Sequence, residues 1–269
     1  MVPPPLFPPA KKRLGQNFLI DPNIVRKIVA LAELKPDDCV LEIGPGRGVL
    51  TEALSRSAGK VVAVEIDPVL HRALQELQRE WPNVEVICED ALRYPLERLP
   101  PGTIVVANLP YYISTALLFH LLENDGRFPR LVLMLQEEVA DRLIAKPGRS
   151  DYGVLSIMAQ YAADITKSFK VSANCFRPRP EVGSAVVLLR TKSQRPLSPA
   201  DEAKFAGLVK ASFAHRRKTL VNSLRDEGQD QRSVVAALTA LGLSSTVRAE
   251  QLTLDQFIEM TRRVDELDM

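Results

Sequence analysis

The tetrapeptide Asn108-Leu109-Pro110-Tyr111 has residue types that suit the methylation of a planar amine. It ends an apolar run, residues 103–108, that is typical of a buried strand. The amino group of adenine, cytosine or glutamine has its lone pair delocalised into the ring or carbonyl, so a site must accept both N–H hydrogens. The Asn108 side-chain oxygen and the Pro110 carbonyl can accept them, and Tyr111 can stack on the plane. We predict Asn108, Pro110 and Tyr111 as catalytic residues; the alternative is a strand that runs into a proline turn.

A glycine turn lies between two strand-like runs, residues 39–44 and 60–67, with a helical stretch between the turn and the second run. This order predicts a βαβ unit. Gly44 and Gly46 let the backbone approach a ligand, and Glu65 follows Gly44 by 65 − 44 = 21 residues, near the spacing at which an acid meets a ribose hydroxyl. The pattern is GxGxG and not GxGxxG, which favours a nucleoside without a pyrophosphate. S-adenosyl-L-methionine is the candidate, and an ordinary tight turn is the alternative.

A third strand, residues 83–88, ends in Glu89-Asp90. At the carboxyl edge of a parallel sheet such an acid faces the ligand crevice. Asp90 could therefore accept a hydrogen bond from the cofactor's adenine amino group. Its alternative role is to cap a turn or helix.

The pattern predicts an α/β domain followed by helices. Two closing strands, residues 164–172 and 184–192, have no helix between them and imply an antiparallel hairpin at the sheet edge. Residues 194–199 suggest a linker, and only helices are expected after it. We predict three regions: a flexible basic, proline-rich tail (residues 1–14), a methyltransferase domain (15–194) and a helical C-terminal RNA-binding domain (195–269).

Composition describes an ordinary globular protein. The 269 residues are 46% hydrophobic and carry a formal charge of +2, so total charge favours no anionic partner. The three cysteines have no metal-binding spacing, and we expect buried thiols in a reducing compartment and no metal site. No apolar stretch is long enough to cross a membrane, so we expect no membrane partner and a cytoplasmic location.

Basic residues gather in one part of the chain. Residues 167–225 contain thirteen basic and three acidic residues, which is typical of a surface that binds a polyanion. The candidate RNA-binding residues are Arg177, Arg179, Arg216, Arg217 and Lys218. A solvated basic face is the alternative.

Taken together, the motifs resemble those of the rRNA adenine N(6),N(6)-dimethyltransferases, and most of all the bacterial members that act on 16S rRNA. The matching segments are Gln16–Leu19, Glu42–Thr51, Glu65–Asp67, Asp90–Leu92, Asn108–Tyr111, Phe176–Pro180 with Val182 and Ser184, Arg216–Leu220 and Arg248–Glu250. The resemblance implies a Rossmann-like methyltransferase domain with a mostly parallel seven-stranded sheet and a small all-α C-terminal domain. It also implies S-adenosyl-L-methionine as methyl donor. The cofactor contacts that it implies are Asn17, Leu19, Gly44, Glu65, Asp90 and Asn108.

The resemblance also implies the substrate: two adjacent adenosines in a hairpin loop near the 3′ end of 16S rRNA, each receiving two methyl groups, in the small subunit or its precursor. A stacked adenine must be splayed out to reach a pocket, and we expect Tyr111 and Phe176 to sandwich it. A role in small-subunit biogenesis and a monomeric state are further expectations. The alternatives are a large-subunit rRNA methylase of the macrolide-resistance type and a non-catalytic RNA-binding assembly factor. A DNA amino-methylase is disfavoured because no target-recognition domain is evident.

Overall fold

The computed structural model describes residues 7–11, 14–124 and 126–267, so the predicted tail lies in large part outside the described residues. The chain divides into two compact units. The first unit contains Met1–Ala140 and Ala163–Ser193, and the second contains Asp141–Ala162 and Gln194–Met269. The second unit thus includes a segment that comes before the predicted C-terminal domain. The domain boundaries drawn from the sequence remain a prediction.

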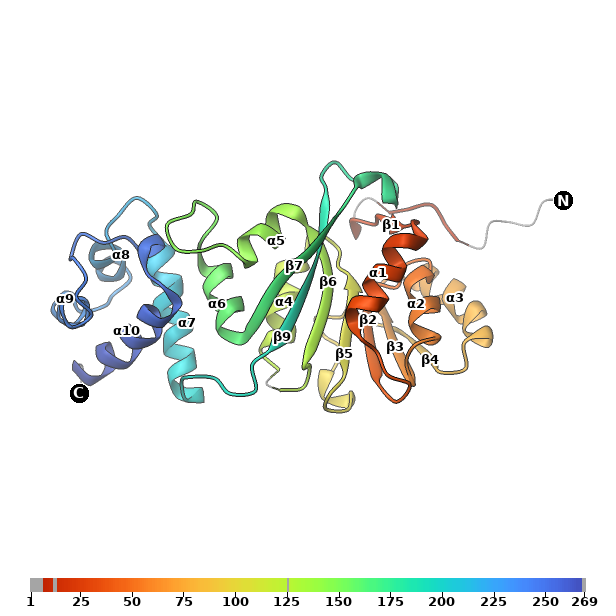
Figure 1. Cartoon of the computed structure of the whole chain (residues 1–269), viewed down its shortest axis with the longest axis horizontal. Coiled ribbons are helices and arrows are strands. Elements are labelled where there is room, and N and C mark those ends of the chain that lie inside the picture. The colour runs from red at the N-terminus through yellow and green to blue at the C-terminus, as the bar shows by residue number, and fades with distance from the viewer. Residues whose placement is uncertain (1–6, 12–13, 125, 268–269) are drawn as a thin grey trace. The chain divides into compact units, whose positions relative to one another are not determined.

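A seven-stranded sheet forms the centre of the first unit (Figure 1). Its order is β4-β3-β2-β5-β6-β9-β7; the first five strands are parallel, and β9 is antiparallel to both β6 and β7. The predicted mostly parallel sheet with an antiparallel edge hairpin is confirmed. Of the two hairpin strands, β7 forms the edge and β9 lies between β7 and β6. The strands are β2 (Cys39–Ile43), β3 (Lys60–Glu65), β4 (Val84–Cys88), β5 (Ile104–Asn108), β6 (Arg130–Gln136), β7 (Ala163–Val171) and β9 (Ser184–Thr191).

Burial along the strands follows their place in the sheet. The central strands β2, β3, β5 and β6 are almost continuously buried, as expected for parallel strands covered on both faces. The edge strand β4 alternates, and Cys88 at its end is exposed. Cys39 and Cys175 are only partly buried, so the prediction of buried thiols was wrong. All three cysteines lie at the end of an element, Cys39 at the start of β2, Cys88 at the end of β4 and Cys175 at the end of a 3₁₀ turn, where the fold encloses side chains less than in the middle of a strand.

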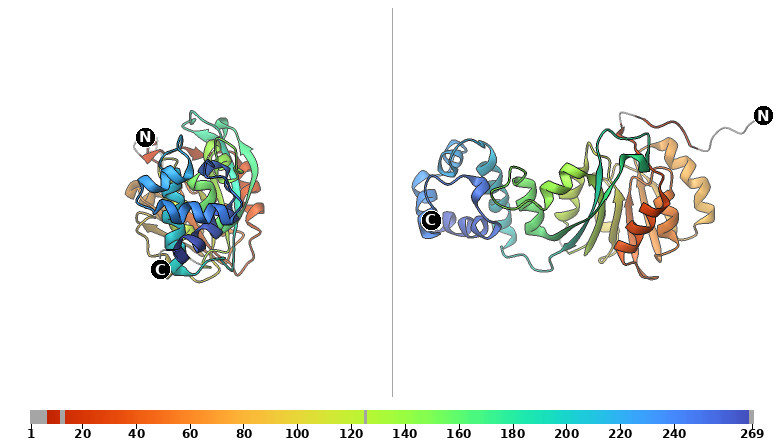
Figure 2. Two further views of the ribbon diagram at one scale, coloured as in Figure 1. Left: turned by 90° about the vertical axis from the view of Figure 1, so that its left-hand side faces the viewer. Right: turned by 45° about the horizontal axis from the view of Figure 1, so that its top comes forward.

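Helices cover both faces of this sheet (Figures 1 and 2). Asp21 and Asp67 cap α1 (Pro22–Ala32) and α3 (Pro68–Leu77), each with proline in the first turn. Together with α2 (Val49–Ser55), these helices pack on one face in a single apolar cluster. The helix α4 (Ser114–Leu122) belongs on the other face, because right-handed crossovers that run in opposite directions along a sheet place their helices on opposite sides.

A second, two-stranded sheet pairs β1 (Phe18–Leu19) antiparallel with β8 (Phe176–Arg177). The Ile20 N–H continues this contact by donating to the Cys175 carbonyl at 2.8 Å. The sequence pattern predicted neither strand, because two-residue strands carry no periodicity. Their pairing fixes the segment before α1 against the connection between β7 and β9.

In the second unit, the described residues form helices and their connections, with no strand. The α-helices are α6 (Val154–Ala162), α7 (Pro199–Phe213), α8 (Leu220–Asp226), α9 (Gln231–Ala240) and α10 (Leu254–Leu267), with the end of α5 (Glu137–Leu143). Phe205 and Phe257 are fully buried in its core. The Thr219 hydroxyl caps α8 by accepting from the Asn222 N–H, so Lys218 lies in the turn that precedes the helix.

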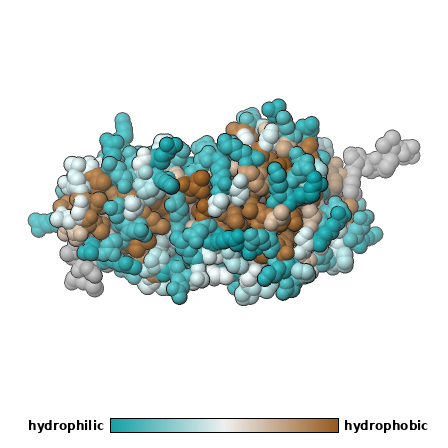
Figure 3. All heavy atoms as spheres, in the orientation of Figure 1, coloured by the Kyte–Doolittle hydropathy of each residue, from teal (hydrophilic) through white to brown (hydrophobic). Residues whose placement is uncertain are grey.

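Polar residues interrupt the hydrophobic ones across the face shown in Figure 3. Within the described part of the chain, no helix is long and apolar enough to cross a membrane.

Candidate active site

The strand order reverses between β2 and β5, which are neighbours in the sheet although β3 and β4 separate them in the chain. Ligands of open α/β sheets bind outside the carboxyl ends of the strands at such a point. A cleft of about 970 Å³, open mouth included, lies at this edge and is lined entirely by the first unit. The predicted site residues that line it are Asn17, Leu19, Gly44, Gly46, Glu65, Asp90, Asn108, Pro110 and Tyr111.

The glycine turn needs its glycines for conformation and for space. Gly44 and Gly46 have φ values of 68° and 58°, in the left-handed region that side chains disfavour. A Cβ atom on Gly46 would lie 2.9 Å from the Phe18 ring. The backbone can therefore approach a ligand closely here, and neither residue can be replaced without strain.

Glu65 is buried at the end of β3 and holds the turn in place. Its carboxylate accepts from the Gly46 N–H at 3.1 Å and from the Asp67 N–H at 2.9 Å. Burial raises the pKa of Glu65, while these backbone donors oppose the rise. A carboxylate has about four acceptor positions, so it can still accept from two ligand hydroxyls.

Glu42 is a second acid of the cleft, and no role was predicted for it from the sequence. It is almost fully buried on β2, one of its oxygens lacks a hydrogen-bond partner, and burial raises its pKa to about 8. The carboxyl group is therefore mostly protonated at neutral pH. An acidic residue inside the apolar run Cys39–Ile43 was the signal that could have found it.

Asn108 ends β5 and meets the segment before α1. Its Nδ2 donates to the Asn17 carbonyl at 3.2 Å, and Asn17 Nδ2 in turn donates to the Gly15 carbonyl. Since Nδ2 is engaged by the protein, the acceptor Oδ1 is the group that Asn108 can offer to a donor. Pro110 and Tyr111 lie beside it along the cleft wall.

Lys11 and Gln16 fasten this N-terminal segment to the end of β3, an anchor that the sequence analysis missed. Lys11 Nζ pairs with Asp67 at 2.7 Å, and Gln16 Nε2 donates to the other Asp67 oxygen at 3.1 Å. The Asp67 side chain is buried, and the Lys11 and Gln16 contacts hold the pKa of Asp67 below its usual value against the effect of desolvation. The segment that contributes Asn17 to the cleft is thereby held over the cofactor side.

Asp90 meets the alternative role considered for it, and its contact with a cofactor stays a prediction. It lines the cleft, and its Oδ1 accepts from the Leu92 N–H at 3.0 Å, so it also stabilises a turn. The second oxygen remains available to a ligand in the cleft.

Phe176 does not join the other predicted catalytic residues. Its side chain is 0% exposed, packs in the apolar core of the first unit and is absent from the cleft lining. The predicted sandwich of a base between Tyr111 and Phe176 is therefore not formed in this structure. The physical reason is that β8 pairs with β1 and places Phe176 opposite the buried Leu19.

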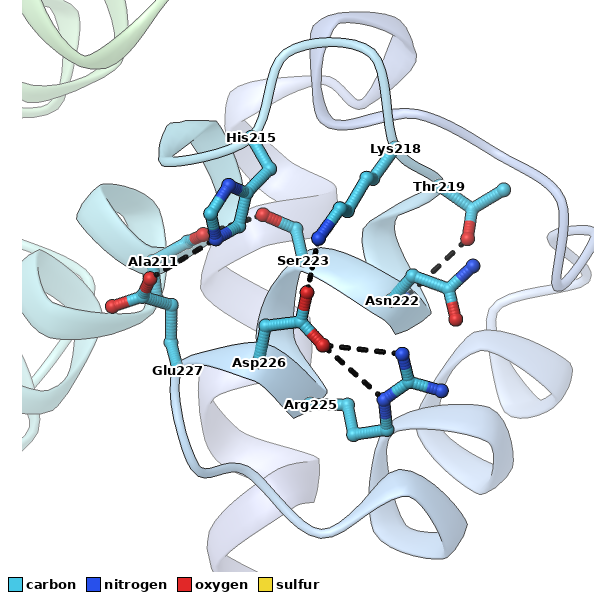
Figure 4. A network of polar contacts seen from close by, with 9 residues as sticks. All are labelled: Ala211, His215, Lys218, Thr219, Asn222, Ser223, Arg225, Asp226 and Glu227. Carbon is cyan, nitrogen blue, oxygen red and sulfur yellow. Dashed lines mark hydrogen bonds and ion pairs between the residues drawn. The ribbon is translucent and has the colours of Figure 1, made fainter.

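The candidate RNA-binding residues fall into two groups. Arg177 and Arg179 are exposed in the first unit; Arg177 is the second residue of β8, and Arg179 follows that strand. Arg216, Arg217 and Lys218 are exposed in the turn between α7 and α8 of the second unit. Figure 4 shows that Lys218 is not isolated: it pairs with Asp226, which also pairs with Arg225.

Comparisons with known proteins identify the family of the chain. The family model "Ribosomal RNA adenine dimethylase" matches residues 9–266. Proteins named "Ribosomal RNA small subunit methyltransferase A" from Ligilactobacillus salivarius and Moorella thermoacetica are 44% and 43% identical, over 93% and 94% of this chain and 88% and 91% of their own. A dimethyladenosine transferase structure from Plasmodium falciparum superimposes with a TM-score of 0.81 at 29% identity, covering 94% of this chain and 98% of its own.

The 23S rRNA methyltransferase ErmE is similar as well, with a TM-score of 0.72 at 30% identity over 93% of this chain and 100% of its own. The fold is thus shared with a dimethyladenosine transferase and with a 23S rRNA methyltransferase. The chain belongs to the ribosomal RNA adenine dimethylases, enzymes whose methyl donor is S-adenosyl-L-methionine.

Proposed function

We propose that this enzyme dimethylates the amino groups of two adjacent adenosines in the 3′-terminal hairpin loop of 16S rRNA, in the small ribosomal subunit or its precursor. The observation that carries the proposal is that Asn108, Pro110 and Tyr111 line the same cleft as Gly44 and Glu65. Curated relatives at 43–44% identity are named as small-subunit methyltransferases, whereas the 23S enzyme is 30% identical. The small-subunit substrate is therefore favoured over the large-subunit one.

The cofactor side of the cleft is assigned as follows. Glu65 accepts from the ribose hydroxyls and Asp90 from the adenine amino group, while Gly44 and Gly46 let the backbone approach the ligand. Asn17 and Leu19 close the cleft from the N-terminal segment. Each of these residues lines the cleft, which supports the assignment.

Catalysis in this proposal is positioning. The cofactor supplies a methyl group on a sulfonium, which needs no further activation. Asn108 Oδ1 and the Pro110 carbonyl accept the two hydrogens of the target amine and so aim its lone pair along the line of transfer. No general base is required, because the proton is acidic once the nitrogen carries positive charge.

Tyr111 stacks on the splayed adenine and sets its plane. Such stacking contributes about 1–3 kcal/mol per base. Phe176 is buried in the core and does not line the cleft, so it cannot stack on a base bound there in this structure. Tyr111 therefore carries the stacking in the conformation described here.

The RNA is held by the phosphate contacts of Arg177, Arg179, Arg216, Arg217 and Lys218, all of which are exposed cations. A cytoplasmic location, a monomeric state and a role in small-subunit biogenesis complete the proposal.

The test is methyl transfer from labelled S-adenosyl-L-methionine to small subunits that lack the modification, with large subunits and DNA in parallel. Nucleoside mass spectrometry should detect dimethyladenosine in the small-subunit reaction alone. Transfer to large subunits instead would support the macrolide-resistance type. RNA binding without any transfer would support a non-catalytic assembly factor.

A further inference from the structure

The Tyr111 ring is tied at its tip to a residue outside the cleft. Its hydroxyl lies 2.6 Å from the Ser184 hydroxyl, a short hydrogen bond in which either group can donate. Ser184 is not part of the cleft lining. The Tyr111 ring therefore lines the cleft, while its hydroxyl is hydrogen-bonded to Ser184 outside the cleft.

Ser184 is a rigid point of attachment. It is 0% exposed and begins β9, the strand between β6 and β7. In the ladders it is paired with Gln136 of β6 and Val171 of β7. Moving its backbone would disrupt hydrogen bonding on both sides, so the Ser184 hydroxyl has a defined position relative to Asn108 at the end of β5, two strands away in the same sheet.

The hydrogen bond persists over the working pH range. Burial raises the pKa of the Tyr111 phenol, so the group stays protonated at neutral and mildly alkaline pH. A protonated phenol with a buried hydroxyl partner is a neutral pair, and neither needs a counter-ion.

We propose that Ser184 is a positioning residue for methyl transfer: it fixes the Tyr111 ring so that a stacked adenine presents its amino group to Asn108 and Pro110. The Asn108 and Pro110 oxygens orient the two amine hydrogens through hydrogen bonds. If the Tyr111 ring could tilt, the stacked adenine would tilt with it, and its amino nitrogen would leave the line of methyl transfer. A misplacement of about 1 Å can lower a rate about 100-fold. This inference rests on the stacking role proposed for Tyr111.

The experiment compares Ser184→Ala, Tyr111→Phe, the double variant and Tyr111→Ala in methyl transfer to small subunits. Each of the first two should lower kcat about tenfold, as expected for the loss of one neutral hydrogen bond used in positioning, with KM for the cofactor and RNA unchanged. The double variant should be no slower than either single one, because both changes remove the same bond. Ser184→Thr, which keeps the hydroxyl, should recover most of the rate.

Thr103→Val is the matched control. Thr103 is also 0% exposed and its hydroxyl donates to the Pro100 carbonyl at 2.7 Å, but it lies before the opposite end of β5. It should lower the melting temperature and leave kcat unchanged. A kcat loss that followed melting temperature across all variants, or additive losses in the double variant, would overturn the positioning role of Ser184.

Tyr111→Ala separates this inference from the proposed function. If Tyr111→Ala is inactive while Ser184→Ala and Tyr111→Phe have the rate of the parent enzyme, the ring matters and its tether does not. If Tyr111→Ala is fully active, the stacking role itself fails, and the positioning role of Ser184 fails with it.

Discussion

The cleft of the first unit and the basic turn of the second unit are built from different kinds of contact. In the cleft, Glu65 and Asn108 are fixed by hydrogen bonds to backbone groups, and buried strands position both residues. In the turn, Arg216, Arg217 and Lys218 are exposed, and the interactions of Lys218 are ion pairs with solvent access. Exposed ion pairs contribute little to stability, whereas buried hydrogen-bonded groups are costly to disturb. Single substitutions should therefore have large effects in the cleft and graded effects in the turn.

Asn108→Ala gives the largest expected effect. It removes the acceptor for the target amine and the donor that meets Asn17, so the rate of methyl transfer should fall about 100- to 1,000-fold, the scale of losing one oriented polar group in an active site. Cofactor binding should weaken only in part. Isothermal titration with S-adenosyl-L-methionine and a single-turnover assay measure the two effects separately. Full activity in this variant would refute the proposed site.

Gly46→Ala should mainly weaken cofactor binding, by about 10- to 100-fold. The new Cβ would have a left-handed backbone conformation and lie 2.9 Å from the Phe18 ring, so the turn or the ring must shift and the hydrogen bond from Gly46 to Glu65 is disturbed. Gly102→Ala is the matched control, since Gly102 also has a positive φ, 88°, but open space around it. Equal cofactor affinity in both variants would show that the turn tolerates a side chain.

These two cases show what a sequence can and cannot predict about the molecule. Gly44, Gly46, Glu65 and Asn108 were found because each sits at the end of a long apolar run, where the parallel topology decides its surroundings. Such local signals also predicted the order of strands and helices. These residues lie in the cleft because they follow strands of the sheet, and each strand can be predicted from residues that are close together in the sequence.

Phe176 shows the limit of that approach. Its burial depends on the pairing of β1 with β8, two short strands more than 150 residues apart, roughly the whole length of the first unit. The contacts of Lys11 with Asp67 and of Tyr111 with Ser184 also join distant segments, 56 and 73 residues apart in the chain. Nothing in the periodicity of one segment indicates its partner in another. These long-range contacts around the cleft could therefore be identified only in the structure.

Glu42 makes stability depend on pH, and the sign can be worked out. The pKa of its carboxyl group is about 8 in the folded protein against an ordinary value of 4.5. Between these values the folded state alone binds the proton, so the free energy of unfolding falls as pH rises from about 4.5 to 8, by up to about 1.4 kcal/mol per pH unit. Urea unfolding between pH 5.5 and 8 should show this slope in the parent enzyme and a smaller one in Glu42→Gln. Equal pH slopes in the parent enzyme and in Glu42→Gln would mean that Glu42 is ionised in the folded state.

The smallest effects are expected in the basic turn, where Arg217 and Lys218 are neighbours with different surroundings. Lys218 is paired with Asp226, whose pKa is lowered chiefly by this lysine, and Asp226 also holds Arg225 (Figure 4). A cation that already has an acidic partner releases fewer counter-ions when it meets a phosphate. Lys218→Ala should therefore weaken rRNA binding less than Arg217→Ala.

Affinity measured between about 50 and 200 mM salt tests the difference, because losing one phosphate contact lowers the slope of log affinity against log salt by about one. Arg217→Ala should show that change, and Lys218→Ala a smaller one. Asp226→Asn removes the acidic partner of both Lys218 and Arg225. In that background, adding Lys218→Ala should change the salt slope by about one, measured against Asp226→Asn alone. Equal slopes for Arg217→Ala and Lys218→Ala in the parent background would show that the ion pair opens at no cost when RNA binds, and the turn would then behave as three independent cations.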